Sequence, residues 1–240
     1  MRNNSGGRGP GYAWLVVGLL WVVALLNYMD RQMLSTMKSS MMVDIFELEK
    51  AENFGKLMAV FLWIYGFMSP VAGLIADRIN RKWLIVASLF VWSGVTFCMG
   101  YTSNFNVLYG LRAVMGISEA LYIPAGLSLI ADYHRGSTRS LAVGIHMTGL
   151  YVGQAMGGFG ATVADAWSWQ SAFHLFGIIG LVYSAILIIA LREHPDRKKV
   201  SHPAVTPKPQ KQPVLSSLTL LLGMTSFWMI LFYLAVPSFP

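Results

Sequence analysis

Four ionisable residues lie inside long apolar stretches of this sequence: Asp30, Arg31, Arg112 and Glu119. A charge at the centre of a membrane-spanning helix costs about 2.5–3.5 kcal/mol on insertion scales, so such residues are paired or line a wet cavity. An arginine there can grip a carboxylate with two parallel hydrogen bonds, and a buried carboxylate can take up and release protons. The sequence therefore predicts either structural ion pairs that fix helix packing or a binding and proton-relay cluster.

The spacing of these residues indicates how they are used. Asp30 and Arg31 are adjacent, so they point to different sides of a helix and each needs a partner elsewhere. Arg112 and Glu119 are seven residues apart, which is two helical turns, so both lie on one face. Gly116 lies between them on that face and leaves room for a neighbouring helix or a solute. We expect Asp30 and Glu119 to carry protons and Arg31 to bind an anion.

Other polar residues in the apolar stretches carry less information. Tyr65 and Gln154 can each hydrogen-bond a solute or a facing helix, and both alternatives stay open. The histidines have no third ligand at a suitable spacing and Cys98 is the single cysteine, so we predict no metal site and no cofactor. The sequence has no glycine-rich phosphate loop and no nucleophile elbow, so we do not expect an enzyme.

The elements that must position these residues are membrane-spanning helices. Of the 240 residues, 55% are hydrophobic and 12% are charged, against about 25% charged in an ordinary soluble domain. This composition excludes a soluble globular domain, a disordered chain and a disulfide-stapled module. A span needs about 20 apolar residues, and seven stretches qualify: 13–35, 56–76, 83–101, 107–130, 140–163, 170–191 and 215–236. Methionines at positions 33, 37 and 41 predict that the first helix continues to about residue 42.

Lysine and arginine are unevenly distributed over the connections between these spans. Thirteen of them fall in the N-terminal tail and the connections on the same side, and three fall on the opposite side. Because cytoplasmic loops carry the excess of basic residues, we predict that the N-terminus lies in the cytoplasm. The net charge of +7 is then mostly a sign of topology, and no nucleic-acid partner is expected.

The chain organises into a bundle, a tether and one further helix. We predict a six-helix half over residues 1–191, a basic and proline-rich cytoplasmic linker over 192–214, and a seventh helix over 215–240. A single helix after a long tether has no bundle of its own. The sequence therefore looks cut off, and a second half is expected as its partner.

The connection between the second and third spans contains a recognisable motif. A glycine and an aspartate are followed by basic residues in the segment 73–82, at Gly73, Asp77, Arg78, Arg81 and Lys82. This segment resembles the signature loop of the major facilitator superfamily. The chain has Asn80 where that loop usually has glycine, a mild departure because Asn tolerates the left-handed conformation.

Two other motifs resemble one branch of that superfamily, the anion:cation symporters, which include sugar-acid, sialic-acid and vesicular glutamate carriers. They are the run from Asn27 to Arg31, and Arg112, Gly116 and Glu119 followed by Pro124. The resemblance implies that Asp30 and Glu119 carry protons, that Arg31 holds the substrate carboxylate and that Arg112 pairs with the relay. Tyr65 and Gln154 fall where such transporters place substrate-contacting side chains. The likeness covers residues 12–191 well.

The family fold implied by this resemblance has two six-helix halves, each an inverted 3+3 repeat, with the site between the halves. We therefore expect an all-α, multi-pass membrane protein with one half and one helix of the other, in a bacterial inner membrane. The leading hypothesis is a secondary transporter of small organic anions coupled to protons, with sodium as the other candidate ion. The alternative is a half-length, non-transporting protein in the bilayer that dimerises or regulates a full-length transporter.

Overall fold

The computed structural model describes residues 10–194 and, beyond them, Gly223, Thr225 and Met229. The chain divides into two compact units, residues 1–198 and 199–240. In the second unit the three described residues are helical, and the rest of the predicted span 215–236 lies outside the described residues. Most of the predicted linker 192–214 does so as well, so the domain boundaries stay a prediction.

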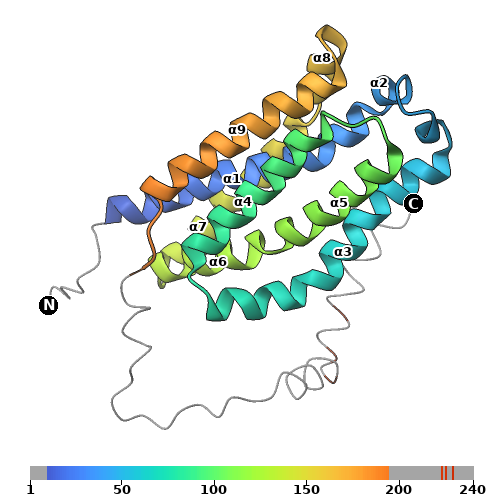
Figure 1. Ribbon diagram of the computed structural model, residues 1–240. Coiled ribbons are helices and arrows are strands. Elements are labelled where there is room, and N and C mark those ends of the chain that lie inside the picture. The colour runs from blue at the N-terminus through green and yellow to red at the C-terminus, as the bar shows by residue number, and fades with distance from the viewer. Residues whose placement is uncertain (1–9, 195–222, 224, 226–228, 230–240) are drawn as a thin grey trace, which may run out of the picture. The chain divides into compact units, whose positions relative to one another are not determined.

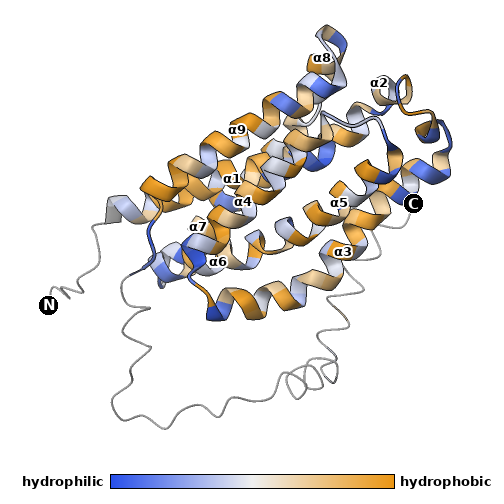
Figure 2. Cartoon of the chain, viewed as in Figure 1, coloured by the Kyte–Doolittle hydropathy of each residue, from blue (hydrophilic) through white to orange (hydrophobic). Residues whose placement is uncertain are grey.

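Helices account for all the regular elements between residues 10 and 194 (Figure 1). They are α1 (Pro10–Thr36), α2 (Lys38–Met42), the 3₁₀ helix η1 (Phe46–Glu49), α3 (Ala51–Arg78), α4 (Arg81–Met99), α5 (Phe105–Ala120), α6 (Tyr122–Tyr133), α7 (Thr138–Met156), α8 (Phe159–Ala166) and α9 (Trp169–Ala190). Figure 2 shows the long helices as mainly apolar, with hydrophilic residues gathered near their ends and in the connections. The predicted all-α architecture is confirmed.

Five helical stretches of the described residues are long and apolar enough to cross a membrane. They are Gly11–Thr36, Ala51–Arg78, Arg81–Met99, Phe105–Tyr133 and Trp169–Ala190. They correspond to the predicted spans 13–35, 56–76, 83–101, 107–130 and 170–191. The predicted span 140–163 is formed by α7 and α8 and is not among the five, since polar residues such as Thr148 and Gln154 dilute its apolar character.

Two of the predicted spans, and the predicted continuation of the first helix to about residue 42, are interrupted where the sequence suggested continuous helices. The first helix ends at Thr36, and α2 follows as a separate short helix after a turn at Met37. The fourth span breaks at Leu121, one turn before Pro124, whose missing N–H removes a helical hydrogen bond. The fifth breaks at two consecutive glycines, Gly157 and Gly158, which separate α7 from α8.

The helices of the first unit pack in an interleaved order. The most extensive contacts join α1 to α7, α3 to α5, and α4 to α9, which pairs the first span with the fifth, the second with the fourth and the third with the sixth. If the first, second and third spans are exchanged with the fourth, fifth and sixth, the first–fifth pairing becomes the second–fourth pairing and vice versa. The third–sixth pairing stays the same. This exchange is the pattern expected of an inverted 3+3 repeat.

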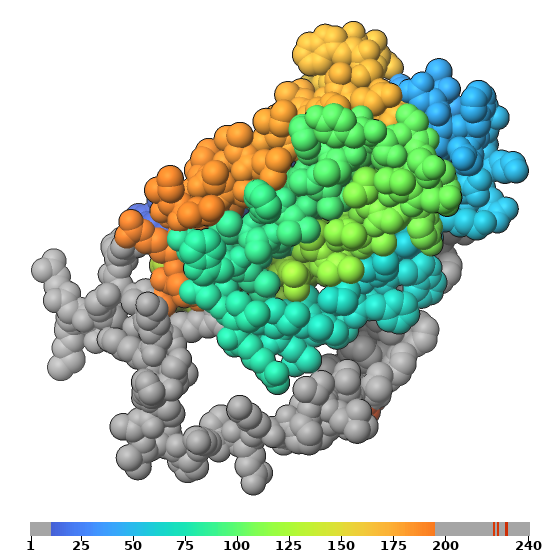
Figure 3. Space-filling model, viewed as in Figure 1, coloured from blue at the N-terminus to red at the C-terminus, as the bar shows by residue number. Residues whose placement is uncertain are grey.

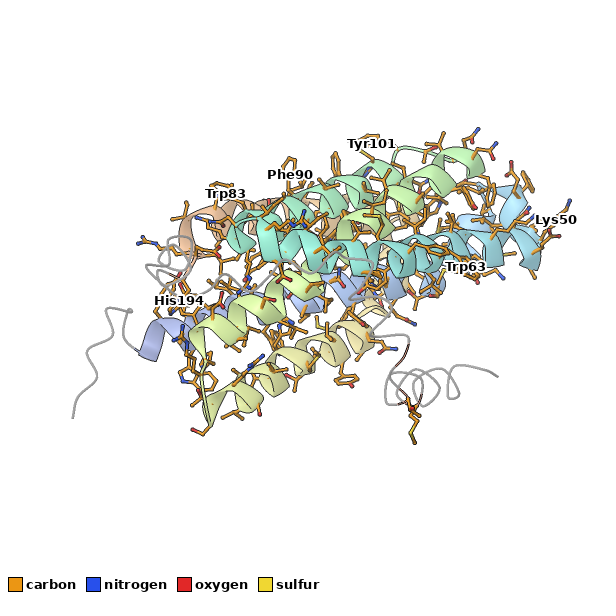
Figure 4. All side chains as sticks on the ribbon, turned by 90° about the horizontal axis from the view of Figure 1, so that it is seen from below. Lys50, Trp63, Trp83, Phe90, Tyr101 and His194 are labelled. Carbon is orange, nitrogen blue, oxygen red and sulfur yellow. The ribbon has the colours of Figure 1, made fainter. Side chains whose placement is uncertain are left out.

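One face of this unit is formed by four helices in the order α9, α4, α5 and α3 (Figure 3). Large apolar side chains point outward from it, and Figure 4 shows Trp83 and Phe90 along the outer side of α4 and Tyr101 just beyond its end. Trp63 of α3 is likewise exposed. Such side chains suit a lipid-facing or partner-facing surface, while the predicted charged residues lie inside the bundle.

Candidate functional site

The four charged residues predicted to do chemistry are brought into the interior of the bundle by two helices. Asp30 and Arg31 lie on α1, and Arg112 and Glu119 lie on α5. Asp30 is 6% exposed, Arg112 1% and Glu119 0%, while the Arg31 side chain is 17% exposed. Two acidic and two basic groups are thus buried together, which balances their charge in a region where single charges are costly.

An ion pair between Arg31 and Glu119 joins α1 to α5. Arg31 Nε donates a hydrogen bond of 2.6 Å to Glu119 Oε2. The guanidinium carbon of Arg31 also lies 4.4 Å from the ring centre of Tyr65 and 4.7 Å from that of Tyr28. Aromatic faces attract a guanidinium through their negative quadrupole. Arg31 is therefore held by a carboxylate on one neighbouring helix and by rings from α1 and α3.

Arg112 has different surroundings. Its Nη1 donates to the sulfur of Met115 at 3.3 Å, and its guanidinium carbon lies 4.6 Å from the ring centre of Phe61. Among the described residues no carboxylate lies within 4 Å of its guanidinium nitrogens. The i, i+7 spacing thus places Arg112 and Glu119 in the same interior, but the ion pair of Glu119 is made with Arg31.

Asp30 is placed against α4. Its Oδ2 lies 3.2 Å from the hydroxyl of Thr96, which also lies 3.0 Å from the carbonyl oxygen of Trp92. No ion pair to Asp30 occurs among residues 10–194. One turn earlier on α1, the fully buried Asn27 has no hydrogen-bond partner for its amide atoms in the described part of the chain. Asp30 is therefore a buried carboxylate with a neutral hydroxyl partner.

The two predicted substrate ligands differ in position. Tyr65 lies against Arg31, as described above. Gln154 is exposed on α7, and the structure gives its side chain no hydrogen bond to the charged residues. The sequence missed three neighbours of the charged residues, namely Tyr28, Phe61 and Thr96. Tyr28 lies one helical turn before Arg31 and Phe61 lies one turn before Tyr65, so their spacing was a weak sign that they face the site. Nothing in the sequence indicated that Thr96 does.

The predicted signature loop joins α3 to α4. Gly73, Asp77 and Arg78 lie in the last turns of α3, and Arg81 and Lys82 begin α4. Asn80 does not use the left-handed conformation expected of it: its φ is −61° and its ψ is 118°. Its side chain instead accepts a hydrogen bond of 3.2 Å from the N–H of Trp83 and caps α4, a role for which asparagine is well suited.

The basic residues of this loop attach it to the ends of other helices. Arg81 forms an ion pair with Asp132 and donates to the carbonyl oxygen of Ser128 at 3.0 Å, both on α6. Lys82 donates through its backbone N–H to Glu193 and through Nζ to the carbonyl oxygen of Ile188. The loop therefore connects α4 to α6 and to the end of α9.

The chemistry available at this site is anion binding and proton exchange. Arg31 Nη2 and Glu119 Oε1 are buried and make no hydrogen bond to any described residue, so the guanidinium has capacity for a second carboxylate. No group of three or more His, Cys, Asp or Glu side chains suited to a metal occurs in the part of the chain that the structure describes.

Known proteins resemble this chain in sequence and fold. The family described as Major Facilitator Superfamily matches residues 20–239. Protein spinster homolog 3 of Danio rerio is 32% identical over 73% of this chain and 36% of its own length. The galacturonate transporter of Dickeya chrysanthemi is 28% identical over 80% of this chain and 55% of its own length. The chain thus spans about a third to a half of these relatives.

A solved structure shows the same fold. A crystal structure of a bacterial homolog of the human lysosomal transporter Spinster, in an inward-facing and unoccupied conformation, superposes with a TM-score of 0.72. The two proteins are 23% identical, and the match covers 90% of this chain and 50% of the other. This likeness supports the fold and leaves the substrate to be argued from the site.

Proposed function

The chain belongs to the Major Facilitator Superfamily, a multi-pass family of membrane transporters, and from that premise we propose that it transports small organic anions, sugar acids in particular. In this proposal the helices of residues 10–194 form one half of the transporter, and a second half supplies the other side of the substrate site. The relatives are two to three times longer than the region matched, which agrees with such a second half. Alternating access then moves the two halves around the fixed site.

The observation that carries the proposal is the environment of Arg31. A partly exposed arginine in a membrane-spanning bundle is held by one carboxylate and by aromatic rings, and its Nη2 has no hydrogen-bond partner among the described residues. A substrate carboxylate fits this position because it can accept two parallel hydrogen bonds from a guanidinium. The rings of Tyr28 and Tyr65 pack against Arg31, and tyrosine hydroxyls can hydrogen-bond the hydroxyl groups of a sugar acid.

The same site supplies the proposed coupling to protons. Glu119 and a substrate carboxylate compete for Arg31, so a proton on Glu119 releases the guanidinium to the substrate. Asp30 is the second proposed proton carrier, because its buried carboxylate faces the neutral Thr96. Arg112 balances the charge of the two acids. We propose protons as the coupling ion because a buried carboxylate that faces a neutral hydroxyl can take up and release a proton.

The orientation of the protein follows from its charges. We propose that the N-terminus and the connections that end α3 and α6 lie in the cytoplasm, since they carry the excess of lysine and arginine. The likeness to a galacturonate transporter of a bacterium favours a bacterial inner membrane. The Dickeya protein also supports the sugar-acid branch predicted from the motifs at Asn27–Arg31 and Arg112–Glu119, whereas the spinster relatives widen the set of candidate substrates.

Replacing Arg31 with lysine tests this proposal. The native protein would be reconstituted in liposomes, and uptake of labelled galacturonate would be measured under an inward proton gradient. Lysine keeps the charge but offers no planar pair of donors, so Arg31→Lys should raise the half-saturating concentration at least about tenfold. Arg139→Lys, at an exposed position on α7, is the matched control and should leave uptake unchanged. Equal half-saturation in Arg31→Lys and the native protein would contradict the assignment.

A further inference from the structure

Phe61 of α3 is close to both arginines that lie inside the membrane. The guanidinium carbon of Arg31 lies 5.0 Å from the centre of its ring and that of Arg112 lies 4.6 Å from it. Both distances are within the range of about 6 Å in which a cation is attracted to an aromatic face. Phe61 is only 2% exposed, in contrast to Trp63 on the same helix, so its ring is shielded from water.

This position is made possible by the close approach of α3 and α5. The carbonyl oxygen of Phe61 faces Gly116, where a Cβ atom would lie 2.9 Å from it. Gly116 is on the turn of α5 that follows Arg112 and precedes Glu119. A larger residue at Gly116 would push α3 away and carry the ring of Phe61 off the guanidinium of Arg112.

The contact to Phe61 does not depend on protonation, whereas the ion pair does. Glu119 loses its charge when it takes a proton, and Arg31 then lacks its carboxylate partner. Arg112 has no carboxylate within 4 Å among the described residues even before that. The ring of Phe61 stays attractive to both guanidinium groups in either state. It can therefore hold them when the ion pair is broken.

We propose that Phe61 is a positioning residue, which fixes Arg31 and Arg112 through cation–π contacts while Glu119 is protonated or displaced by substrate. This inference rests on the proposed function, because it assigns to Phe61 the placement of the anion-binding guanidinium. Loss of the electronic attraction should weaken substrate binding, since Arg31 would keep only its ring contacts to Tyr28 and Tyr65 and would be held less firmly. The maximal rate should change little, because the proton-carrying groups are intact.

Fluorinated phenylalanines separate this electronic role from simple packing. Trifluorophenylalanine at position 61 keeps the size and shape of the ring but removes most of the negative charge from its face. In proteoliposomes the half-saturating concentration of galacturonate should rise roughly fivefold, with the maximal rate within about twofold of the native value. The rise should follow the number of fluorines. An unchanged half-saturating concentration would overturn the proposal.

Phe173 on α9 provides the matched control. It is buried to the same extent, at 2% exposed, and its ring packs against Trp169. No arginine or lysine of the described residues lies over its ring. Trifluorophenylalanine at position 173 should leave the half-saturating concentration unchanged. A rise equal to that at position 61 would show that fluorination acts through packing, which would also overturn the proposal.

A second measurement decides the case in which the native protein does not transport galacturonate. That result would count against the proposed function but would not touch the contacts of Phe61. Thermal unfolding in detergent would then be compared for the fluorinated variants. The midpoint should fall by roughly 2–4 °C for the variant at position 61 and stay unchanged for the variant at 173. Equal midpoints would overturn the inference about Phe61.

Discussion

At the scale of single residues, the site contains two kinds of contact. Some charged side chains form an ion pair, and others lie against uncharged side chains. Arg31 and Glu119 neutralise each other across two helices, and Asp30 relies on the hydroxyl of Thr96. Removing one partner of a buried ion pair typically costs about 3–5 kcal/mol, because the other charge is left uncompensated. Conservative substitutions are therefore the informative ones at this site.

Glu119→Gln imitates the protonated carboxyl group without leaving a cavity. We expect this variant to lose accumulation of galacturonate driven by a proton gradient, because the amide cannot release a proton. Exchange of internal for external galacturonate should persist, since exchange needs no net proton movement. Both are measured in proteoliposomes loaded with or without the substrate. Glu52→Gln, at an exposed ion pair with Lys56, is the control and should accumulate normally. Full accumulation by Glu119→Gln would refute its role in coupling.

The sequence could predict the buried charged residues but not their partners. Asp30, Arg31, Arg112 and Glu119 stand out because charges are rare in apolar stretches. The partner of Glu119 depends on how the fold places α1 relative to α5, and Arg31 and Glu119 are separated by 88 positions in the chain. The same applies to Phe61, which an apolar pattern does not distinguish from any other residue that faces the core. Gln154 is the opposite case. The sequence made it a candidate because it is polar in an apolar stretch, but the structure places it on the surface.

At the scale of helices, the apolar stretches of the sequence predicted where the spans lie. The positions at which the helices break depend on particular residues within those stretches. The breaks near Pro124 and at Gly157–Gly158 had signals in the sequence, because proline lacks a donor and paired glycines weaken a helix. The turn at Met37 had none, since the methionine spacing continued through it. The break near Pro124 comes at Leu121, two residues after Glu119, so the ion pair lies next to the interruption of the fourth span.

The contact between α1 and α7 provides a test at this scale. A Cβ atom on Gly153 would overlap the backbone carbonyl of Leu25, whereas one on Gly144 of the same helix meets nothing within 4 Å. Overpacking typically costs about 1–3 kcal/mol, so Gly153→Ala should lower the midpoint of thermal unfolding in detergent by several degrees, roughly 2–4 °C per kcal/mol. Gly144→Ala should be neutral or stabilising, because alanine favours helix. Equal midpoints for the two variants would contradict the described packing.

At the scale of the whole molecule, the fold explains why the site lies where it does. The pairings of α1 with α7, α3 with α5 and α4 with α9 place the charged residues of α1 and α5 inside the bundle and leave apolar side chains on its outer surface. The family assignment supports a transporter built on this bundle. In the proposed transporter, Arg31, with its side chain 17% exposed, is the charged group open to the solute.

Proton movement driven by the substrate is the most direct test of this account. The native protein would be reconstituted in liposomes that contain a pH-sensitive dye, with no initial pH gradient, and galacturonate would be added outside. The account predicts that the interior acidifies as galacturonate enters, and that Glu119→Gln liposomes show no acidification. Entry of galacturonate into native liposomes without any change of internal pH would contradict proton-coupled transport.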